Sequence, residues 1–182
     1  MLTTLNRILL ALVAATFLLL PAASALQAAV DPRDPYAHFF HPTFGDFQEE
    51  LEDARAGGKK GILIFFEMEE CPFCHRMKQQ VLNRPEVQEF YREHFAIFSI
   101  DVEGDIEITD FQGNSLRQSE FAFREFRVRA TPVFQFFDLD GEPTVRFTGA
   151  TRDAQEFLQL GEFVADGHYR QMNFTRFKRA TR

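Results

Sequence analysis

Hydrophobic residues recur at the spacing of an α-helix in five stretches of the chain. Apolar side chains three or four positions apart lie on one face of a helix, so each stretch predicts an amphipathic helix with one buried side. The first is carried by Phe44, Phe47, Leu51 and Ala54 and ends at Gly57-Gly58. The predicted helices are 44–56, 72–82, 85–94, a short helix and turn at 119–128, and a last helix from Thr151 to about 165.

Other apolar runs are continuous rather than periodic, as expected of strands that are buried on both faces. The predicted strands are 62–66, 95–101, 131–137 and 144–148, and the turn sequence at 138–141 joins the last two into a hairpin. Residues 102–118 indicate a small hairpin or only a loop. The basic C-terminal tail at 170–182 is expected to be a partly solvated, frayed end. This order of elements predicts an α/β domain in three layers, with a central mixed sheet flanked by helices.

The first 25 residues have the organisation of a secretory signal peptide. One positive charge in residues 1–7 precedes an apolar run at 8–20, which is shorter than the about 20 residues of a membrane-spanning helix. Ala23 and Ala25 form the small-x-small pattern that precedes a signal-peptide cleavage point. We therefore expect export with cleavage after Ala25, with Ala29 as the second choice and an uncleaved N-terminal anchor as the alternative. Residues 26–43 are then an extended lead-in to the domain.

Charge argues against one class of partner. The net charge of −7 becomes −8 once the signal peptide is removed, because that segment carries one positive charge. Nucleic-acid-binding domains present a basic surface. We therefore expect no nucleic-acid partner.

The chain has two cysteines, Cys71 and Cys74, between a predicted buried strand and a predicted helix. This context places Cys71 at a helix N-terminus, where free N–H groups and the helix dipole favour an anion, so its thiol should ionise more readily than a free cysteine. Two cysteines in an exported protein usually form one disulfide. A loop this short gives little stabilisation. The pair therefore predicts a dithiol/disulfide redox centre.

Two other uses fit cysteines at this spacing, a haem attachment site and a zinc site. The stretch from Cys71 to His75 also fits the Cys-x-x-Cys-His signature of c-type haem attachment. A haem protein would need a helical pocket and a distal ligand, whereas this chain has the pattern of a mixed sheet. A structural zinc site needs four ligands, and no second paired spacing is formed by His38, His41, His94 and His168. We expect no metal and no cofactor, with haem as the remote alternative.

Three features, in this order, resemble the thioredoxin superfamily. They are a strand leading into Cys71-Pro72-Phe73-Cys74 at a helix start, Thr131-Pro132 opening a later strand, and a terminal hairpin followed by a helix. The resemblance covers residues 44–166 and leaves a C-terminal tail at 167–182. More narrowly, the chain is similar to the SoxW-type periplasmic thioredoxins of bacterial sulfur-oxidation systems, through the phrases at 66–68, 101–105 and 127–132.

The resemblance implies a thioredoxin fold and a thiol–disulfide oxidoreductase. Cys71 would be the exposed nucleophile and Cys74 the shielded resolving thiol. Pro132 would be a cis-proline, and the backbone of Thr131 would pair with an extended substrate. Phe73, between the cysteines, should be exposed and contact a partner. The resemblance also implies a monomer in the periplasm, disulfide-containing proteins or sulfur compounds as substrates, and a membrane electron donor of the DsbD/CcdA type.

Two departures from the family pattern concern charge near Cys71. Strongly reducing thioredoxins often bury an acid six residues before the first cysteine, where this chain has Phe65. The residue immediately before the first cysteine is usually aromatic, whereas this chain has Glu70 there. The negative charges of Glu67, Glu69 and Glu70 disfavour the Cys71 thiolate. The helix N-terminus acts in the opposite direction and favours the thiolate by about 0.3–1 kcal/mol. The sign of the net effect stays open. Glu67 is a candidate proton relay, and the alternative is a solvated loop carboxylate.

Reductases, oxidases and isomerases share this scaffold, and the redox potential decides which reaction operates. Isomerases of the superfamily usually add a dimerisation domain, and oxidases insert a helical domain. The extra segment at 102–118 is too short for such an insertion. We therefore expect a reductase. The alternatives are an oxidase, an isomerase, or a carrier that holds sulfur compounds on Cys71 without turnover.

Overall fold

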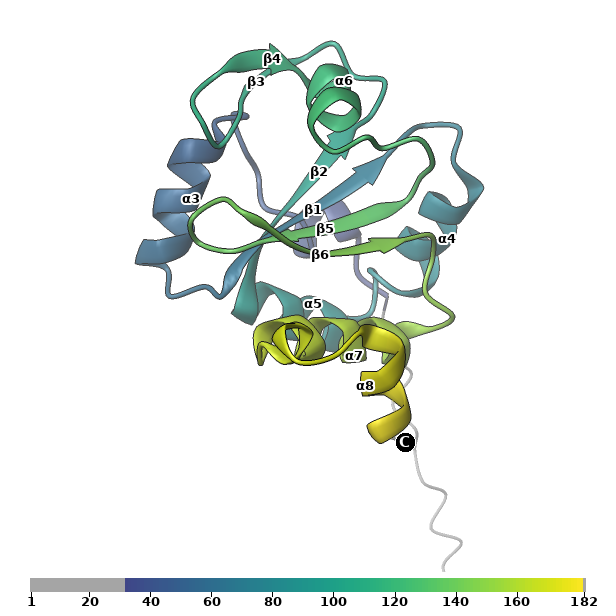
Figure 1. The fold of residues 1–182 in the computed structure, drawn as a ribbon. Helices are drawn as coiled ribbons and strands as arrows, with labels where there is room; N and C mark the ends of the chain where they lie inside the picture. Colours follow the sequence, from purple (N-terminus) through teal and green to yellow (C-terminus); the bar gives the residue numbers. More distant parts are fainter. Residues whose placement is uncertain (1–31, 182) are drawn as a thin grey trace, which may run out of the picture.

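A four-stranded mixed sheet forms the centre of the molecule (Figure 1). The computed structural model describes residues 32–181, so the predicted signal peptide and its cleavage point lie outside the described residues. The strand order is β2-β1-β5-β6; β1 and β2 are parallel, and the other neighbours are antiparallel. The strands are β1 (Gly61–Glu67), β2 (Phe95–Asp101), β5 (Val133–Phe137) and β6 (Pro143–Thr148). The predicted α/β class with a mixed sheet is confirmed.

Helices cover both faces of this sheet. In Figure 1, α5, α7 and α8 lie below the sheet, α6 and the β3–β4 hairpin lie above it, and α3 and α4 lie to its left and right. The buried side chains of α4 pack in the same cluster as those of α5 and α7, and those of α3 pack in the cluster on the other face. None of the helices within residues 32–181 is both long enough and apolar enough to cross a membrane. The remaining elements are α2 (Pro35–His38), α3 (Phe47–Ala56), α4 (Pro72–Gln80), α5 (Pro85–His94), β3 (Glu107–Thr109), β4 (Ser115–Arg117), α6 (Gln118–Glu120), the π-helical turn η2 (Phe121–Glu125), α7 (Ala154–Ala165), η3 (His168–Arg170) and α8 (Phe174–Ala180).

The central strand β1 divides the core into two aromatic clusters. All seven of its residues are buried. Successive side chains of a strand point to opposite faces, so Leu63 and Phe65 join the cluster under α4, α5 and α7, while Ile64 and Phe66 join the cluster under α3 and the hairpin. Each large apolar side chain buried in this way contributes about 1.5–3 kcal/mol. The phenylalanine-rich composition therefore serves the two faces of the sheet.

Two predicted helix starts are wrong, for the same reason. The side chain of Asp46 accepts hydrogen bonds from the backbone N–H groups of Gln48 and Glu49 and so begins α3 at Phe47, not at residue 44. Phe44 is fully exposed. Asp153, rather than Thr151, caps α7 in the same manner. A carboxylate that satisfies free N–H groups fixes where a helix begins.

The segments on either side of the predicted domain are also structured. The lead-in is not simply extended, because α2 forms there and Phe39 and Phe40 are buried in the main core. The predicted frayed tail is ordered over residues 174–180, because α8 places Phe177 against Phe163 with ring centroids 5.4 Å apart. Residues 102–118 contain the β3–β4 hairpin, one of the two structures expected there.

A pair of carboxylates links this hairpin to η2. Asp110 is buried and accepts hydrogen bonds from the backbone N–H groups of Gln112 and Asn114 and from the Asn114 amide. Burial acts to raise the pKa of Asp110, but these hydrogen bonds outweigh it and lower that pKa. Burial, followed by the charge of Asp110, raises the pKa of Glu125 to about 7. The Glu125 carboxyl therefore takes up a proton at a higher pH than an ordinary glutamate.

This pair predicts a stability change with pH. Since the pKa of Glu125 is raised by folding, its contribution to the free energy of unfolding decreases as pH rises from about 4.5 to about 7. Glu125→Gln should remove that decrease. The side chain is largely exposed, so solvent screening keeps the difference to about 1 kcal/mol or less. Chemical unfolding of wild type, Glu125→Gln and the control Glu52→Gln at pH 5 and pH 8 measures it, and equal decreases in all three would contradict the expectation.

A second prediction concerns Gly161 in α7. Alanine in a helix interior is favoured over glycine by about 0.5–1 kcal/mol, yet a Cβ at this position would lie 2.5 Å from Phe90 Cε1 and 3.0 Å from Tyr91 Cζ. Overpacking of this kind costs about 1–3 kcal/mol. Gly161→Ala should therefore lower the free energy of unfolding by about 1 kcal/mol. A gain in stability in denaturant titration would show that the two rings move aside.

Candidate redox site

The candidate site lies where several strands of the sheet end together. β1 and β2 are parallel and finish at the same edge, and β5, antiparallel to β1, begins there with Phe66 opposite Val133. This register brings the loop that follows Glu67 beside Thr131-Pro132. The Gly149 N–H, just after β6, donates to the Pro132 carbonyl at 2.8 Å. The predicted cysteine and proline segments are therefore neighbours in space.

The two cysteines occupy the N-terminus of α4, as the sequence predicts. Cys71 is the N-cap residue, and its Sγ accepts a hydrogen bond from the Cys74 N–H at 3.0 Å. Pro72 opens the helix, where a missing N–H is harmless. A disulfide bond joins Cys71 and Cys74. The sulfur of Cys71 thus lies among helix N–H groups that favour a thiolate once the bond is reduced.

The structure differs from the expected exposure of Cys71. Cys71 is 2% exposed and Cys74 is fully buried, so neither sulfur of the disulfide form is an open surface group. Phe73, between them, is 59% exposed. The N-cap hydrogen bond and the disulfide turn the Cys71 side chain inward.

The loop before β5 forms the second part of the site. The Thr131–Pro132 peptide bond is cis. Thr131 lines a groove of about 480 Å³ that extends to Phe123 on η2. The Thr131 hydroxyl oxygen is buried and has no hydrogen-bond partner within residues 32–181. The groove is also lined by the apolar residues Met68, Val102, Val128 and Ala130 and by the charged or polar residues Glu103, Ser119, Glu120, Arg124 and Arg129.

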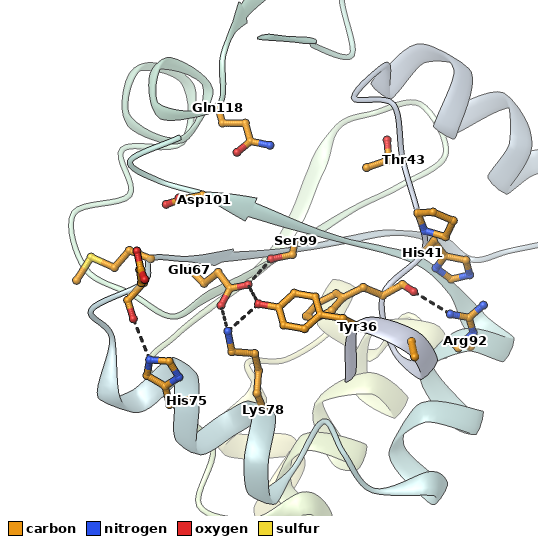
Figure 2. Close-up of a pocket in the computed structure, with 15 residues that line it drawn as sticks. Tyr36, His41, Thr43, Glu67, His75, Lys78, Arg92, Ser99, Asp101 and Gln118 are labelled. Carbon is orange, nitrogen blue, oxygen red and sulfur yellow. Dashed lines mark hydrogen bonds and ion pairs between the residues drawn. The ribbon is translucent and has the colours of Figure 1, made fainter. Parts of the chain in front are cut away.

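Glu67 is a buried strand residue, so the interpretation as a solvated loop carboxylate is wrong. It ends β1 and is 7% exposed. Lys78 Nζ, from α4, donates to its Oε2 at 2.5 Å. Tyr36 Oη donates to Oε1 at 2.9 Å, and Ser99 Oγ, from β2, donates to the same atom at 2.6 Å. Figure 2 shows the four side chains converging from separate elements.

Electrostatics hold this group together. Burial opposes the charged form of Lys78, but hydrogen bonds to Glu67 and Tyr36 outweigh it and raise the pKa of the ammonium group. Burial raises the pKa of the Tyr36 hydroxyl, and the hydrogen bond from Lys78 offsets only part of that rise. Tyr36 is therefore a neutral donor, and Lys78 a cation, at neutral pH. A buried pair of this kind needs its extra donors, because desolvation removes much of the Coulombic gain.

A cleft of about 750 Å³ connects this cluster with solvent (Figure 2). Its other end is formed by His41 and Arg92. Burial, followed by the charge of Arg92, lowers the pKa of His41 to about 4, so this ring is neutral. Its Nδ1 accepts the Ile97 N–H at 2.9 Å. His41 thus acts as a backbone partner in the cleft wall.

Sequence reasoning found the cysteines, Thr131-Pro132 and Glu67, but missed Tyr36, Lys78 and Ser99. Lys78 could have been found, because it lies seven residues after Cys71 and so on the same helix face. Tyr36 and Ser99 lie 31 and 32 residues from Glu67 in the chain, and no local pattern links them. Within residues 32–181 no group of three His, Cys, Asp or Glu residues is arranged to hold a metal ion.

Comparisons with known proteins agree with this geometry. The family model of the thioredoxin-like domain matches residues 47–165. Among solved structures, a thioredoxin-fold protein from Helicobacter pylori is 23% identical, with TM-score 0.56, covering 68% of this chain and 82% of that one. A thioredoxin from Thermus thermophilus is 24% identical, with TM-score 0.53 and coverage of 74% and 96%. The oxidised C-terminal domain of DsbD from Neisseria meningitidis is 20% identical, with TM-score 0.51 and coverage of 69% and 98%.

No curated protein matches the chain. At these identities the solved structures show the fold, and the family model covers most of the described residues. The cysteine pair at the N-terminus of α4 supplies the group that thiol–disulfide exchange requires. The chain belongs to the thioredoxin-like family and is a thiol–disulfide oxidoreductase.

Proposed function

We propose that this protein is an exported, periplasmic reductase of disulfides in proteins or sulfur compounds. The observation that carries the proposal is the disulfide between Cys71 and Cys74 at a helix N-terminus, next to the groove at Thr131. Export rests on the signal peptide predicted at residues 1–25, and the periplasm on the SoxW-type resemblance. Within this proposal the protein works as a monomer.

The reaction is a two-step exchange of sulfur–sulfur bonds. The Cys71 thiolate attacks one sulfur of a substrate disulfide, a bond forms to Cys71, and the other substrate sulfur leaves as a thiolate that takes up a proton. Cys74 then loses its proton and attacks the Cys71 sulfur, which releases the second substrate thiol. The substrate gains two electrons and two protons, and the protein is left as the observed disulfide.

Substrate contacts are proposed at Thr131, Pro132 and Phe73. Thr131 Oγ1 is a buried oxygen with no partner in the described part of the chain, and buried polar groups normally have one. Because this oxygen is shielded from solvent, the contact proposed for an extended substrate is with the Thr131 backbone. Phe73, between the cysteines, and Phe123, which lines the groove, are each more than half exposed. Their apolar surface suits a polypeptide better than a small ion.

Glu67 is proposed as the proton acceptor for Cys74. Its side chain lies on the face of β1 that α4 covers, because Phe65, two residues earlier, packs in the same cluster as both cysteines. The cleft beside it gives protons a route to solvent. Glu67 would then serve at the end of β1, where Phe65 occupies the usual position of the acid.

Renewal of the dithiol needs a donor of two electrons. We propose a membrane protein of the DsbD/CcdA type, since an exported thioredoxin has no access to cytosolic reductants. The likeness of the chain to the C-terminal domain of a DsbD supports a disulfide relay between similar folds. The donor's dithiol would attack the Cys71–Cys74 bond by the same chemistry.

The cysteine variants test the proposed reaction. Wild type should accelerate dithiol-driven reduction of insulin, and Cys71→Ser should abolish the acceleration, because the attacking thiolate is gone. Cys74→Ser should accumulate a mixed disulfide with substrate, seen by non-reducing electrophoresis and mass spectrometry. Equal rates for wild type and Cys71→Ser would overturn the reductase function. Trapping by Cys71→Ser instead of Cys74→Ser would reverse the two roles.

A further prediction concerns Phe73. Phe73→Ser removes an exposed aromatic ring between the cysteines. It should raise KM for a protein disulfide about 5- to 30-fold, because lost interface anchors cost about 1–2 kcal/mol. Reduction of a small disulfide such as oxidised glutathione should change little. Phe44→Ser is the matched control, because Phe44 is fully exposed and lines neither cleft. Equal KM values for the three proteins would remove Phe73 from the binding surface.

A further inference from the structure

The face of α4 that carries the cysteines also carries a cation. Cys71, Cys74 and Lys78 are separated by three and four residues, a spacing that places side chains on one side of a helix. Four residues rise by about 6 Å, so Lys78 lies one turn beyond Cys74. Its ammonium group is bonded to Glu67 on the adjacent strand. The second sulfur therefore has an ion pair next to it along the helix.

Although the cleft reaches it, this pair is less exposed to water than the other charges around the disulfide. The side chains of Lys78 and Glu67 are 16% and 9% exposed. Glu69, Glu70 and His75 are exposed, and His75 Nε2 donates to the Glu69 carbonyl rather than to a sulfur. Exposed charges are screened by solvent, whereas shielded ones act at low effective dielectric.

The remaining nearby charges have other partners or lie in solvent. Arg76, on α4, donates to the Thr151 carbonyl at 2.8 Å and so points toward the loop before α7. Asp101, at the end of β2, is exposed and accepts the Glu103 N–H. Glu67 and Lys78 are thus the charges most able to alter the proton affinity of the cysteines.

Tyr36 completes the pair from a distant part of the chain. Its hydroxyl group bridges both charges, accepting from Lys78 at 2.8 Å and donating to Glu67, and the Lys78 ammonium lies 5.0 Å from the centre of its ring. The segment around α2 is fixed by the backbone bonds Arg33 N–H to Asn83 O and His41 N–H to Ile97 O. The ring of Tyr36 is therefore held over the pair as a cover.

We propose that Lys78 and Tyr36 are positioning residues of the redox centre: they hold the Glu67 carboxylate fixed and compensated beside Cys74, and so set how strongly the reduced protein holds the Cys71 thiolate. The inference rests on the proposed redox function and deepens it. It makes α2, outside the matched family domain, part of the machinery that sets the potential.

Neutralising Lys78 and neutralising Glu67 should shift the pKa of Cys71 in opposite directions. Lys78→Gln leaves the negative charge of Glu67 uncompensated, which disfavours the thiolate and should raise the pKa of Cys71. Glu67→Gln leaves the positive charge of Lys78 and should lower that pKa. Coulomb's law for partly shielded charges gives changes of about 0.5–1.5 pH units. Since stabilising the thiolate stabilises the reduced protein, the equilibrium constant with glutathione should change by up to about 3- to 30-fold, also in opposite directions.

The experiment titrates thiolate absorbance of the reduced full mature protein and measures its equilibrium with glutathione at several pH values. Lys78→Arg keeps the charge and should return the pKa of Cys71 to within about 0.3 units of wild type. Lys178→Gln is the matched control, because Lys178 forms a half-buried pair with Glu156 on other elements. It should change neither the pKa nor the equilibrium.

Tyr36 is tested by combining substitutions. Tyr36→Ala admits water to the pair, so the differences that Lys78→Gln and Glu67→Gln produce should fall to half or less in that background. Tyr169→Ala, which removes a tyrosine from η3, should leave both differences unchanged. If Lys78→Gln does not fold, Glu67→Gln and Lys78→Arg still give the direction and the charge dependence.

Each outcome decides between the proposals. Opposite shifts that shrink without Tyr36 support the inference. Shifts in the same direction, or shifts no larger than those of Lys178→Gln, overturn it while leaving disulfide exchange intact. Loss of insulin reduction in Cys71→Ser, together with retained reduction in Lys78→Gln, would then keep the proposed function. Wild-type rates in Cys71→Ser would instead remove the proposed function itself.

Discussion

Burial of β1 on both faces is the constraint on which the rest of the structure depends. Its side chains alternate between two aromatic clusters, so helices must cover the sheet on each side, and the strand has no face left for solvent. The chain can leave this environment only at the strand's end. The first residues after it are the loop and the helix N-terminus that carry the cysteines. A rigid, dry strand thus delivers the sulfurs to a defined place at the sheet edge.

Much of this arrangement could be predicted from the sequence, because local and tertiary preferences agree. α5 and β2 have the predicted bounds, since Pro85 opens the helix and a dense apolar run follows it. α2 and α8 were missed because four- and seven-residue helices are marginal alone and form through contacts of Phe39 and Phe177 with the core. Helix starts were misplaced where an aspartate side chain, rather than the apolar period, sets the boundary.

The candidate site likewise contains residues that the sequence predicts and residues that it does not. Cys71 and Cys74 are marked by a local sequence signature, and Thr131-Pro132 by the resemblance to the family. The partners of Glu67 come from three other elements, and the sequence has no pattern that pairs residues so far apart. The predicted strand ends at Phe66, because a charged residue at the end of an apolar run ordinarily marks the exit to solvent. Here the strand extends one residue further, and the ion pair compensates the buried charge.

The two terminal helices change what counts as the smallest complete unit of this protein. A polypeptide trimmed to residues 47–165, the part that the family pattern recognises, would lack Phe39 and Phe40 below the sheet and Phe177 beneath α7. It would also lack Tyr36 over the buried pair. The family pattern therefore marks the common scaffold, whereas the folding unit of this chain begins before it and ends after it. Transplanting the redox centre to another protein would require both extensions.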